Sequence, residues 1–327
     1  MKYTQLGRTG LTVSRLCLGT MTFGNQNSEP ESHAILDAAL EGGIDFIDTA
    51  DVYPMAGERG SQGRTEEFIG SWLKGKRESV VLATKCVGRM GPKRWNQGMN
   101  RKHILEAIDA SLKRLGTDYV DLYQLHGYDP LTPIDEALEA LDTVVRQGKA
   151  RYVGVSNWPA YKVARALGRS ETRNLVKFAS HQPRYNLLFR PFERDLLPLC
   201  LEEGIGVIPY NPLAGGMLTG KHKAGAPPAE GTRFAVAPGY QQRYWHEHEF
   251  ETIEAFRGLA EQAGVSMATL AVAWTLAHPA ITAPIVGASR PEQLKDSLAA
   301  VDFDLSADLK ARLDEVSHSW RTVEADR

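Results

Sequence analysis

The sequence predicts one closed (β/α)8 barrel, the TIM barrel architecture of the α/β class, with an N-terminal β-hairpin and extra C-terminal helices. Eight short apolar runs alternate with amphipathic segments over the 327 residues, and no linker-like stretch separates them. Runs such as Val80–Ala83 are apolar on both faces, as expected of buried parallel strands. Because repeated βα units without linkers close into one barrel, we expect residues 1–327 to form a single domain.

The eight expected strands are short and contain β-branched or other bulky apolar residues. No Gly-x-Gly-x-x-Gly run follows the first of them, which disfavours a Rossmann-type dinucleotide-binding domain. The expected strands are Leu16–Leu18, Phe46–Asp48, Val80–Thr84, Asp121–Leu125, Tyr152–Val155, Phe178–His181, Gly206–Pro209 and Pro284–Val286.

Helices are expected in the intervals between these strands. Asn100 has the character of an N-cap for a helix over Arg101–Leu115 that ends at Gly116. Pro133 stands near the first turn of a second helix, which runs to Gln147. Similar patterns predict helices over Glu66–Leu73, Pro159–Leu167, Glu193–Glu203, Met267–Ala277 and Pro291–Val301.

Three features lie outside the eight units. Tyr3–Ser14 contains Gly7–Gly10 between short alternating runs, which predicts a hairpin, and we place it across the bottom of the barrel. Ala214–Gln242 is rich in Gly, Pro and Ala and predicts a long structureless loop, which in a compact domain is usually functional. Extra helices are expected over Trp245–Gln262 and Ser306–Trp320.

Composition excludes several classes of protein. The net charge of −2 provides no basic footprint for nucleic acid or for an anionic membrane. Cys17, Cys86 and Cys200 are widely spaced, which argues against a disulfide framework and against a zinc site. No apolar run approaches the ~18 residues of a membrane span, and the polar N-terminus lacks a signal-peptide core. We therefore expect a cytoplasmic protein with a small-molecule partner; its oligomeric state stays open.

Four polar side chains stand at or just past the ends of three consecutive expected strands. They are Asp48, Tyr53, Lys85 and His126. In a (β/α)8 barrel these positions meet at the C-terminal face, where active sites lie. Reduction of a carbonyl needs a proton donor for the oxygen, and a Lys85 ammonium held by Asp48 is expected to lower the pKa of Tyr53, while His126 polarises the carbonyl. Each residue alone is also compatible with a cap, a salt bridge or packing, so the prediction depends on the set.

These residues resemble a known catalytic tetrad. The run Asp48–Tyr53, the pair Thr84-Lys85 and the His126 that closes Asp121–His126 are similar to the tetrad of the aldo-keto reductase superfamily. The resemblance covers nearly the whole chain and is greatest to the bacterial branch related to potassium-channel β-subunits. It implies reversible NADP(H)-dependent reduction of aldehydes or ketones, sugar carbonyls included, with Tyr53 as general acid and base.

The same resemblance implies a cofactor site. Ser156, Asn157 and Gln182 match residues that bind the nicotinamide carboxamide, and Tyr210 matches the aromatic that stacks on the ring. Other matching positions lie in the stretch that covers the pyrophosphate and in the segment that binds the adenosine phosphate. They are Asn211, Leu213, Gly215, Leu218, Lys221, Gly287, Ser289, Arg290, Gln293 and Ser297.

Some interpretations remain open. Ser156 and Asn157 are also compatible with a cap for the following helix, and Arg290 with a cap or a solvent-exposed position. The strictness of NADPH over NADH is not set by the sequence. A regulatory NADP(H)-binding subunit with slow turnover is one alternative function, and a phosphate-binding barrel isomerase is another.

Aromatic side chains are candidates for the wall of the substrate pocket. Trp158 is the first choice because it adjoins Asn157, and Trp95 and Tyr128 are expected with it. Tyr240, Tyr244 and Trp245 are further candidates, although packing is an equally simple role for each.

Overall fold

The computed structural model describes residues 1–55 and 60–322, and it confirms the barrel. Eight parallel strands follow the order β10-β3-β4-β5-β6-β7-β8-β9. Between β9 and β10 the circle is completed by single bridges, among them the bond from Ile285 N to Pro209 O at 2.8 Å. The strands are β3 (Cys17–Gly19), β4 (Phe46–Asp48), β5 (Val81–Cys86), β6 (Val120–Leu125), β7 (Ala150–Ser156), β8 (Phe178–Gln182), β9 (Gly206–Val207) and β10 (Ile285–Val286).

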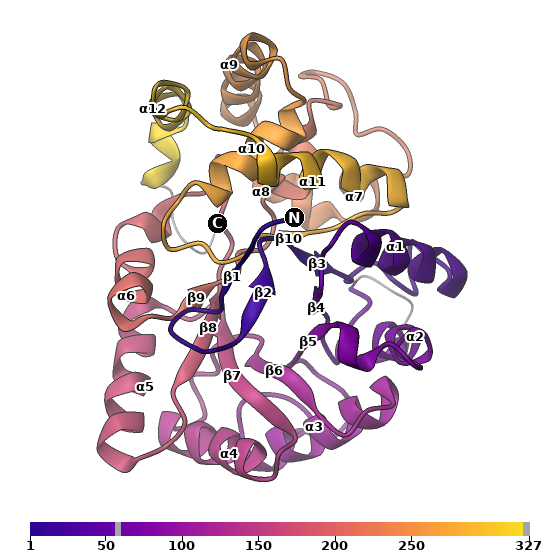
Figure 1. The fold of residues 1–327 in the computed structure, drawn as a ribbon, viewed down its shortest axis with the longest axis vertical. Coiled ribbons are helices and arrows are strands. Elements are labelled where there is room, and N and C mark those ends of the chain that lie inside the picture. The colour runs from indigo at the N-terminus through magenta and orange to yellow at the C-terminus, as the bar shows by residue number, and fades with distance from the viewer. Residues whose placement is uncertain (56–59, 323–327) are drawn as a thin grey trace.

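The helices surround this barrel (Figure 1). The sequence analysis missed α1 (Glu29–Glu41), although a capping pair marks its start: the Glu31 carboxylate accepts a hydrogen bond from Ser28 N at 2.8 Å. The expected helices occur as α2 (Arg64–Trp72), α3 (Arg101–Leu115), α4 (Ile134–Arg146), α5 (Ala160–Arg173), α6 (Leu196–Glu203), α10 (Met267–Leu276) and α11 (Leu294–Asp302).

Helix α3 shows how local chemistry sets these boundaries. The Asn100 side chain accepts a hydrogen bond from His103 N at 2.9 Å, so one of the otherwise unpaired first-turn N–H groups is satisfied. At the other end, Gly116 takes a left-handed conformation with φ 63°, where a residue with a Cβ would be strained. Both ends of this helix match the prediction.

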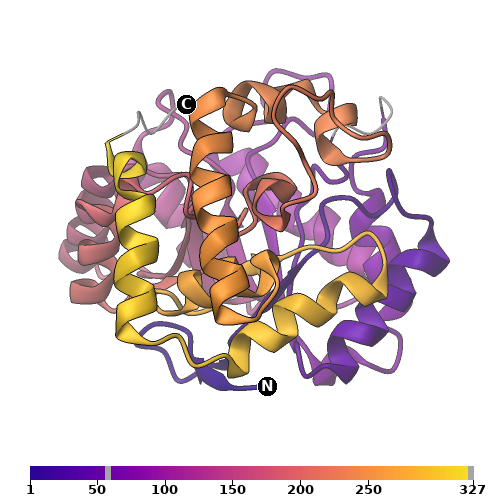
Figure 2. The ribbon, with the colours of Figure 1, turned by 90° about the horizontal axis from the view of Figure 1, so that it is seen from above.

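The N-terminal hairpin closes one end of the barrel. Strands β1 (Tyr3–Gln5) and β2 (Thr12–Ser14) pair antiparallel, and the buried Leu6 belongs to the cluster of apolar side chains inside the barrel. Gly7 lies so close to the start of β9 that a Cβ on it would come within 2.4 Å of Gly204 O. Figure 2 shows the hairpin beside the N-terminus at one end and the orange segment around residues 230–245 at the opposite end.

That opposite segment differs from its prediction. Ala214–Gln242 is not structureless, since it contains η3 (Ala214–Thr219), α7 (Arg233–Val236) and most of α8 (Pro238–Tyr244). These helices are too short to produce a visible 3.6-residue period. The expected helix over Trp245–Gln262 begins later, as α9 (Glu247–Ala263).

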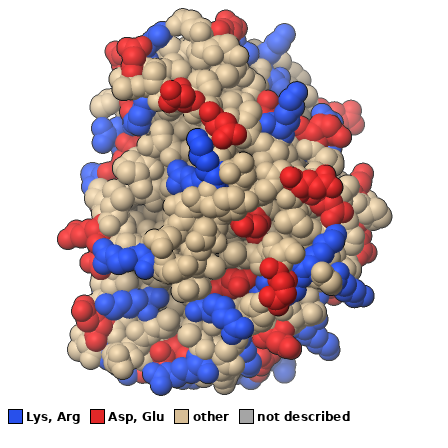
Figure 3. Space-filling view, in the orientation of Figure 1, with Lys and Arg blue, Asp and Glu red and all other residues tan. Residues whose placement is uncertain are grey.

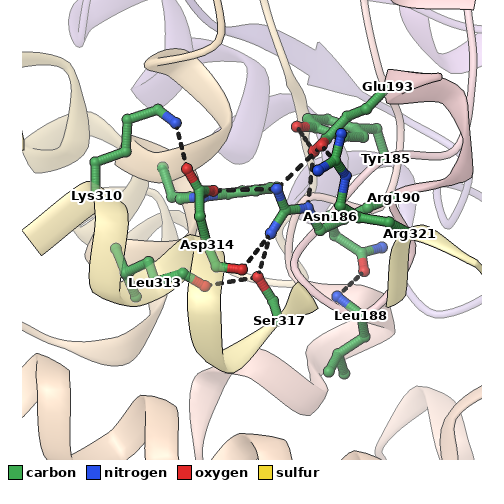
Figure 4. Close-up of polar contacts among 11 residues, drawn as sticks. Tyr185, Asn186, Leu188, Arg190, Glu193, Lys310, Leu313, Asp314, Ser317 and Arg321 are labelled. Carbon is green, nitrogen blue, oxygen red and sulfur yellow. Dashed lines mark hydrogen bonds and ion pairs between the residues drawn. The ribbon is translucent and has the colours of Figure 1, made fainter. Parts of the chain in front are cut away.

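A buried arginine attaches the C-terminal segment to the barrel. The expected helix Ser306–Trp320 is divided into α12 (Ala307–Val316) and η5 (His318–Arg321). Arg190, just before η2 (Pro191–Glu193), donates to Ser317 Oγ at 2.6 Å and to both oxygens of Glu193. Figure 4 shows its guanidinium between Glu193 and the end of α12.

The surface charge, the helices and the potential metal ligands of the described residues give no sign of another class of protein. On the face seen in Figure 3, basic and acidic side chains are interspersed. Within residues 1–55 and 60–322, no helix combines the length and apolar character needed to cross a membrane. Nor does that part of the chain contain a cluster of three or more His, Cys, Asp or Glu side chains suited to a metal ion.

Candidate active site

The barrel brings the four expected residues together at the C-terminal ends of its strands. Asp48 ends β4, Lys85 lies near the end of β5, His126 follows β6, and Tyr53 lies in the turn after β4. The Lys85 ammonium lies 2.5 Å from Asp48 Oδ2 and 3.4 Å from Tyr53 Oη. Lys85 is fully buried and Asp48 nearly so, and this makes their charges mutually dependent.

Two amides hold the second oxygen of Asp48. Gln182 Nε2 donates to Asp48 Oδ1 at 2.9 Å, and Gln124 Nε2 donates to the same atom at 3.3 Å. One N–H of Gln182 is thereby used on the carboxylate, so its Oε1 and its second N–H remain for a carboxamide. Gln124 was not identified from the sequence, although an amide between the bulky residues Tyr123 and Leu125 was a usable signal.

The electrostatics of Lys85 and Tyr53 differ in part from the expectation. Burial opposes the charge of Lys85, but the nearby Asp48 and Tyr53 outweigh it, and the pKa of Lys85 is raised. Burial also raises the pKa of Tyr53, and Lys85 offsets only part of that rise. The expected net lowering of the Tyr53 pKa is therefore wrong for the protein alone. Tyr53 is a phenol at neutral pH, which is the form that can give a proton.

His126 is neutral in this setting. Burial, together with the charge of Lys85, lowers the pKa of His126 to about 3. Its ring meets the Tyr53 ring edge-on, with the centroids 5.6 Å apart. A neutral imidazole can donate one N–H to an oxygen placed beside the Tyr53 hydroxyl.

A cavity of about 400 Å³ opens over these residues. Asn157 lies at its rim with φ 58°, a left-handed conformation that asparagine tolerates. Its amide donates to His126 O at 3.1 Å, and its Oδ1 accepts from Tyr210 Oη at 2.9 Å. Ser156 Oγ donates to Gln182 O at 2.8 Å. Helix α5 has no side-chain cap, so Ser156 and Asn157 connect strand ends instead of capping it.

A second cavity of about 390 Å³ adjoins the first, because Thr22, Asn211, Arg233, Ile285 and Gly287 line both. Several of the residues expected at the cofactor line it as well. These are Leu213, Gly215, Lys221, Ser289 and Gln293.

Three other expected positions lie outside the lining of the second cavity. Leu218 and Ser297 are buried, and Arg290 is exposed nearby without making a side-chain cap for η4 (Pro291–Gln293). Burial and then the charges of Arg233 and Arg290 lower the pKa of Lys221, which places both arginines within electrostatic reach of Lys221. Within the described residues, none of these three cations has a carboxylate partner.

Comparison with known proteins decides the family. The aldo/keto reductase family model matches residues 15–318. The chain belongs to the aldo/keto reductase family. This makes it an oxidoreductase of the class that acts on carbonyl compounds and alcohols.

Individual relatives align over nearly the full chain. An uncharacterized oxidoreductase, YrpG of Bacillus subtilis, is 40% identical over 97% of this chain and 96% of its own. Protein tas of Escherichia coli is 37% identical over 97% of both chains. A probable voltage-gated potassium channel subunit beta of Arabidopsis thaliana is 37% identical over 92% of both.

The reductase barrel does not place the expected tryptophan in the wall of its catalytic cavity. Trp158 is 1% exposed and packs edge-on against Phe178 and Tyr128, with the ring centroids 5.6 and 5.1 Å apart. The left-handed Asn157 turns the chain, so its sequence neighbour faces the packed interior. Tyr128 lines a separate surface cavity, and Trp95 lies beside Lys93 and Arg94.

The cavity wall of this reductase comes from other segments. Of the further aromatic candidates, Tyr240 lines it, whereas Tyr244 and Trp245 pack beside it. Sequence analysis missed a group of lining residues that follow β3 and β4 or belong to α7 and α8. They are Gly19, Thr20, Met21, Thr22, Met55, Arg233, Ala237, Gly239 and Arg243. The run after β3 was a usable signal, because it directly follows a barrel strand.

Proposed function

We propose that this chain reduces aldehydes and ketones to alcohols, reversibly, with NADP(H) as cofactor and Tyr53 as general acid and base. The observation that carries the proposal is the contact chain Asp48–Lys85–Tyr53 beside a neutral His126 at the floor of the cavity. Sugar carbonyls are included among the possible substrates. A phosphate-binding isomerase needs no nicotinamide, so it would leave the residues expected to hold one without a role; these are Ser156, Asn157, Gln182 and Tyr210.

The residues of the two cavities fit a dinucleotide phosphate. Asn211 lines both, and its buried Nδ2 has no hydrogen-bond partner among the described residues, so it offers an unused donor. Lys221, Arg233 and Arg290 provide positive charge suited to phosphate groups. Ser156, Asn157, Gln182 and Tyr210 line or adjoin the catalytic end, where they would hold the nicotinamide. When bound, NADPH supplies a hydride.

The catalytic residues stabilise the negative charge that develops on the substrate oxygen. Tyr53 Oη gives its proton to that oxygen during reduction and takes it back during oxidation. The tyrosinate formed is stabilised by Lys85, which Asp48 keeps charged and in place. His126 donates an N–H to the same oxygen and polarises the carbonyl before the proton moves. Burial keeps water from weakening these interactions.

The test is a comparison of the wild type with Tyr53→Phe. Loss of NADPH absorbance with a nitrobenzaldehyde should be rapid in the wild type and about a hundredfold to ten-thousandfold slower in the variant. NADPH binding, followed by quenching of protein fluorescence, should be nearly unchanged, because the hydroxyl acts on the substrate. Near-normal turnover by Tyr53→Phe would overturn the assigned role, and no turnover by the wild type across a panel of aldehydes and ketones would overturn the activity.

A second function is favoured by one specific observation, the similarity to probable potassium-channel β-subunits. It is an NADP(H)-binding regulatory subunit that turns over slowly. Stopped-flow measurement of NADP(H) exchange separates the two functions. Tight NADP(H) binding with very slow cofactor exchange, together with a stable complex with a partner protein, would favour the regulatory function.

A further inference from the structure

The catalytic cavity is lined by positive charge that the catalytic residues do not balance. Among its described lining residues Asp48 is the only carboxylate, and Lys85 already neutralises it. Arg233 and Arg243 contribute two guanidinium groups from α7 and α8, on either side of Tyr240 in the sequence. A neutral aldehyde carries no negative charge that could pair with these guanidinium groups.

The two arginines occupy different places. Arg233 lines both cavities and lies within electrostatic reach of Lys221, so it belongs with the cations of the cofactor cavity. Arg243 lines only the catalytic cavity, together with Tyr53 and His126. A phosphate held in the adjoining cavity therefore leaves the charge of Arg243 unmatched.

The Arg243 side chain is available for a ligand. It forms no ion pair or hydrogen bond with any described residue, and its guanidinium carbon lies 5.9 Å from the centre of the Tyr240 ring. It is solvent-exposed and lines the cavity, so its N–H groups remain for a planar or tetrahedral oxyanion.

We propose that Arg243 binds an anionic group of the substrate, a carboxylate or a phosphate, and so selects aldehydes and ketones that carry one. This inference rests on the proposed reductase activity. Tyr53 and His126 hold the carbonyl end of such a substrate at the floor of the cavity, and Arg243 pairs with the anionic end at its mouth. Arg243 is a specificity residue and takes no part in proton transfer.

The test compares charged and neutral forms of one aldehyde. Wild-type kcat/KM should be higher for 4-carboxybenzaldehyde than for its methyl ester, and higher for glyceraldehyde 3-phosphate than for glyceraldehyde if phosphate is the group bound. Arg243→Gln should reduce the preference for the anion about tenfold, mainly through KM, and Arg243→Lys should restore part of it. The preference should decrease as salt is added, because the pair is exposed.

Arg194→Gln is the matched control, because Arg194 is an exposed arginine that lines neither cavity. It removes the same charge and should leave the preference unchanged. An equal loss of kcat/KM for acid and ester in Arg243→Gln would overturn the inference while leaving the reductase activity intact. If the wild type reduces no aldehyde, the proposed reductase activity is rejected, but the anion site at Arg243 can still be tested. The test is then calorimetric binding of 4-(hydroxymethyl)benzoate. Equal affinity in the wild type and Arg243→Gln would then overturn it.

Discussion

Two buried cations, Lys85 and Arg190, are held by carboxylates in different ways. Arg190 donates four hydrogen bonds, to the two oxygens of Glu193, to Asp314 O and to Ser317 Oγ, and it forms an ion pair of 3.2 Å with the Asp314 carboxylate. Lys85 has two short contacts, to Asp48 and Thr49 O, and a longer one of 3.4 Å to Tyr53. The arginine joins segments of the chain. Under the proposed mechanism the lysine would strengthen its longer contact to the Tyr53 oxygen when that oxygen becomes charged.

The surroundings explain this difference. Arg190 also borders a cavity of about 680 Å³ beside α12, but its hydrogen bonds and ion pairs already join it to Glu193, Asp314 and Ser317 (Figure 4). A guanidinium held in this way stabilises a tertiary contact. An ammonium beneath an open cavity, next to a phenol, can stabilise a new anion. Both cations are buried, so burial does not distinguish the candidate active site. The difference is that Lys85 makes fewer close contacts than Arg190 and lies beneath an open cavity.

Removal of Lys85 gives the largest expected effect. Lys85→Met should reduce kcat for aldehyde reduction by at least about a hundredfold, because the tyrosinate formed at Tyr53 loses its counter-charge. NADPH affinity should change little, since Lys85 is fully buried below the cavity. Steady-state kinetics and fluorescence titration measure the two quantities. A kcat within threefold of the wild type would show that Lys85, like Arg190, has only a structural role.

Removal of Arg190 should act on stability instead. Arg190→Met leaves the partly buried carboxylates of Glu193 and Asp314 with fewer partners, and the free energy of unfolding should fall by about 2 to 3 kcal/mol. Urea unfolding measures this loss. The kcat of the folded protein should stay within about twofold, as expected of a contact remote from the reacting atoms. Arg194→Met, in an exposed neighbouring position, should change neither quantity.

Lowering the pH should destabilise the folded chain through His126, which lies in the region of Lys85 and not in that of Arg190. The pKa of His126 is lowered to about 3 in the folded chain, so between pH ~6.5 and 3 the unfolded chain binds the proton and the folded chain does not. This group therefore destabilises the fold progressively as pH falls through that window, and it has no effect above pH ~7. His126→Asn should reduce the stability lost between pH 7 and pH 5 by about 1–2 kcal/mol. An unchanged loss would contradict the burial of a neutral imidazole.

An exposed cation should give the smallest effect. Arg290 lies in solvent near the cofactor cavity without a carboxylate partner among the described residues, unlike the two buried cations. Arg290→Ala should weaken NADPH binding about tenfold and NADH binding hardly at all, because only NADPH carries the 2′-phosphate. The effect should shrink with added salt. Equal losses for both cofactors in fluorescence titrations would remove Arg290 from the phosphate site.

Prediction from the sequence was most successful where local chemistry decides the structure. Helix α3 matched at both ends, because Asn100 and Gly116 act on their immediate neighbours. The eight strands followed from short apolar runs of fixed order, and the positions of Asp48, Lys85 and His126 followed from the ends of those strands. The short helices α7 and α8 escaped notice because neither is long enough to show a helical period.

The direction in which a side chain points was harder to predict. Trp158 faces the packed interior although its neighbour Asn157 lies at the cavity rim, because one left-handed residue reverses the direction of the chain. Arg233 and Arg243 enter the cavity wall from a segment about a hundred residues beyond the end of the catalytic strands. No local pattern connects α8 to Tyr53.

By itself the sequence determined the barrel, its family and the identity of the four catalytic candidates, because strand order and strand ends follow from periodicity and from the family motif. Only the tertiary structure decided the sign of the Tyr53 pKa shift, the partners of Gln182 and the charge of the cavity wall. These properties depend on burial and on distances between segments that are remote in sequence. Electrostatic energies vary steeply with both, and neither is encoded in any local run of residues.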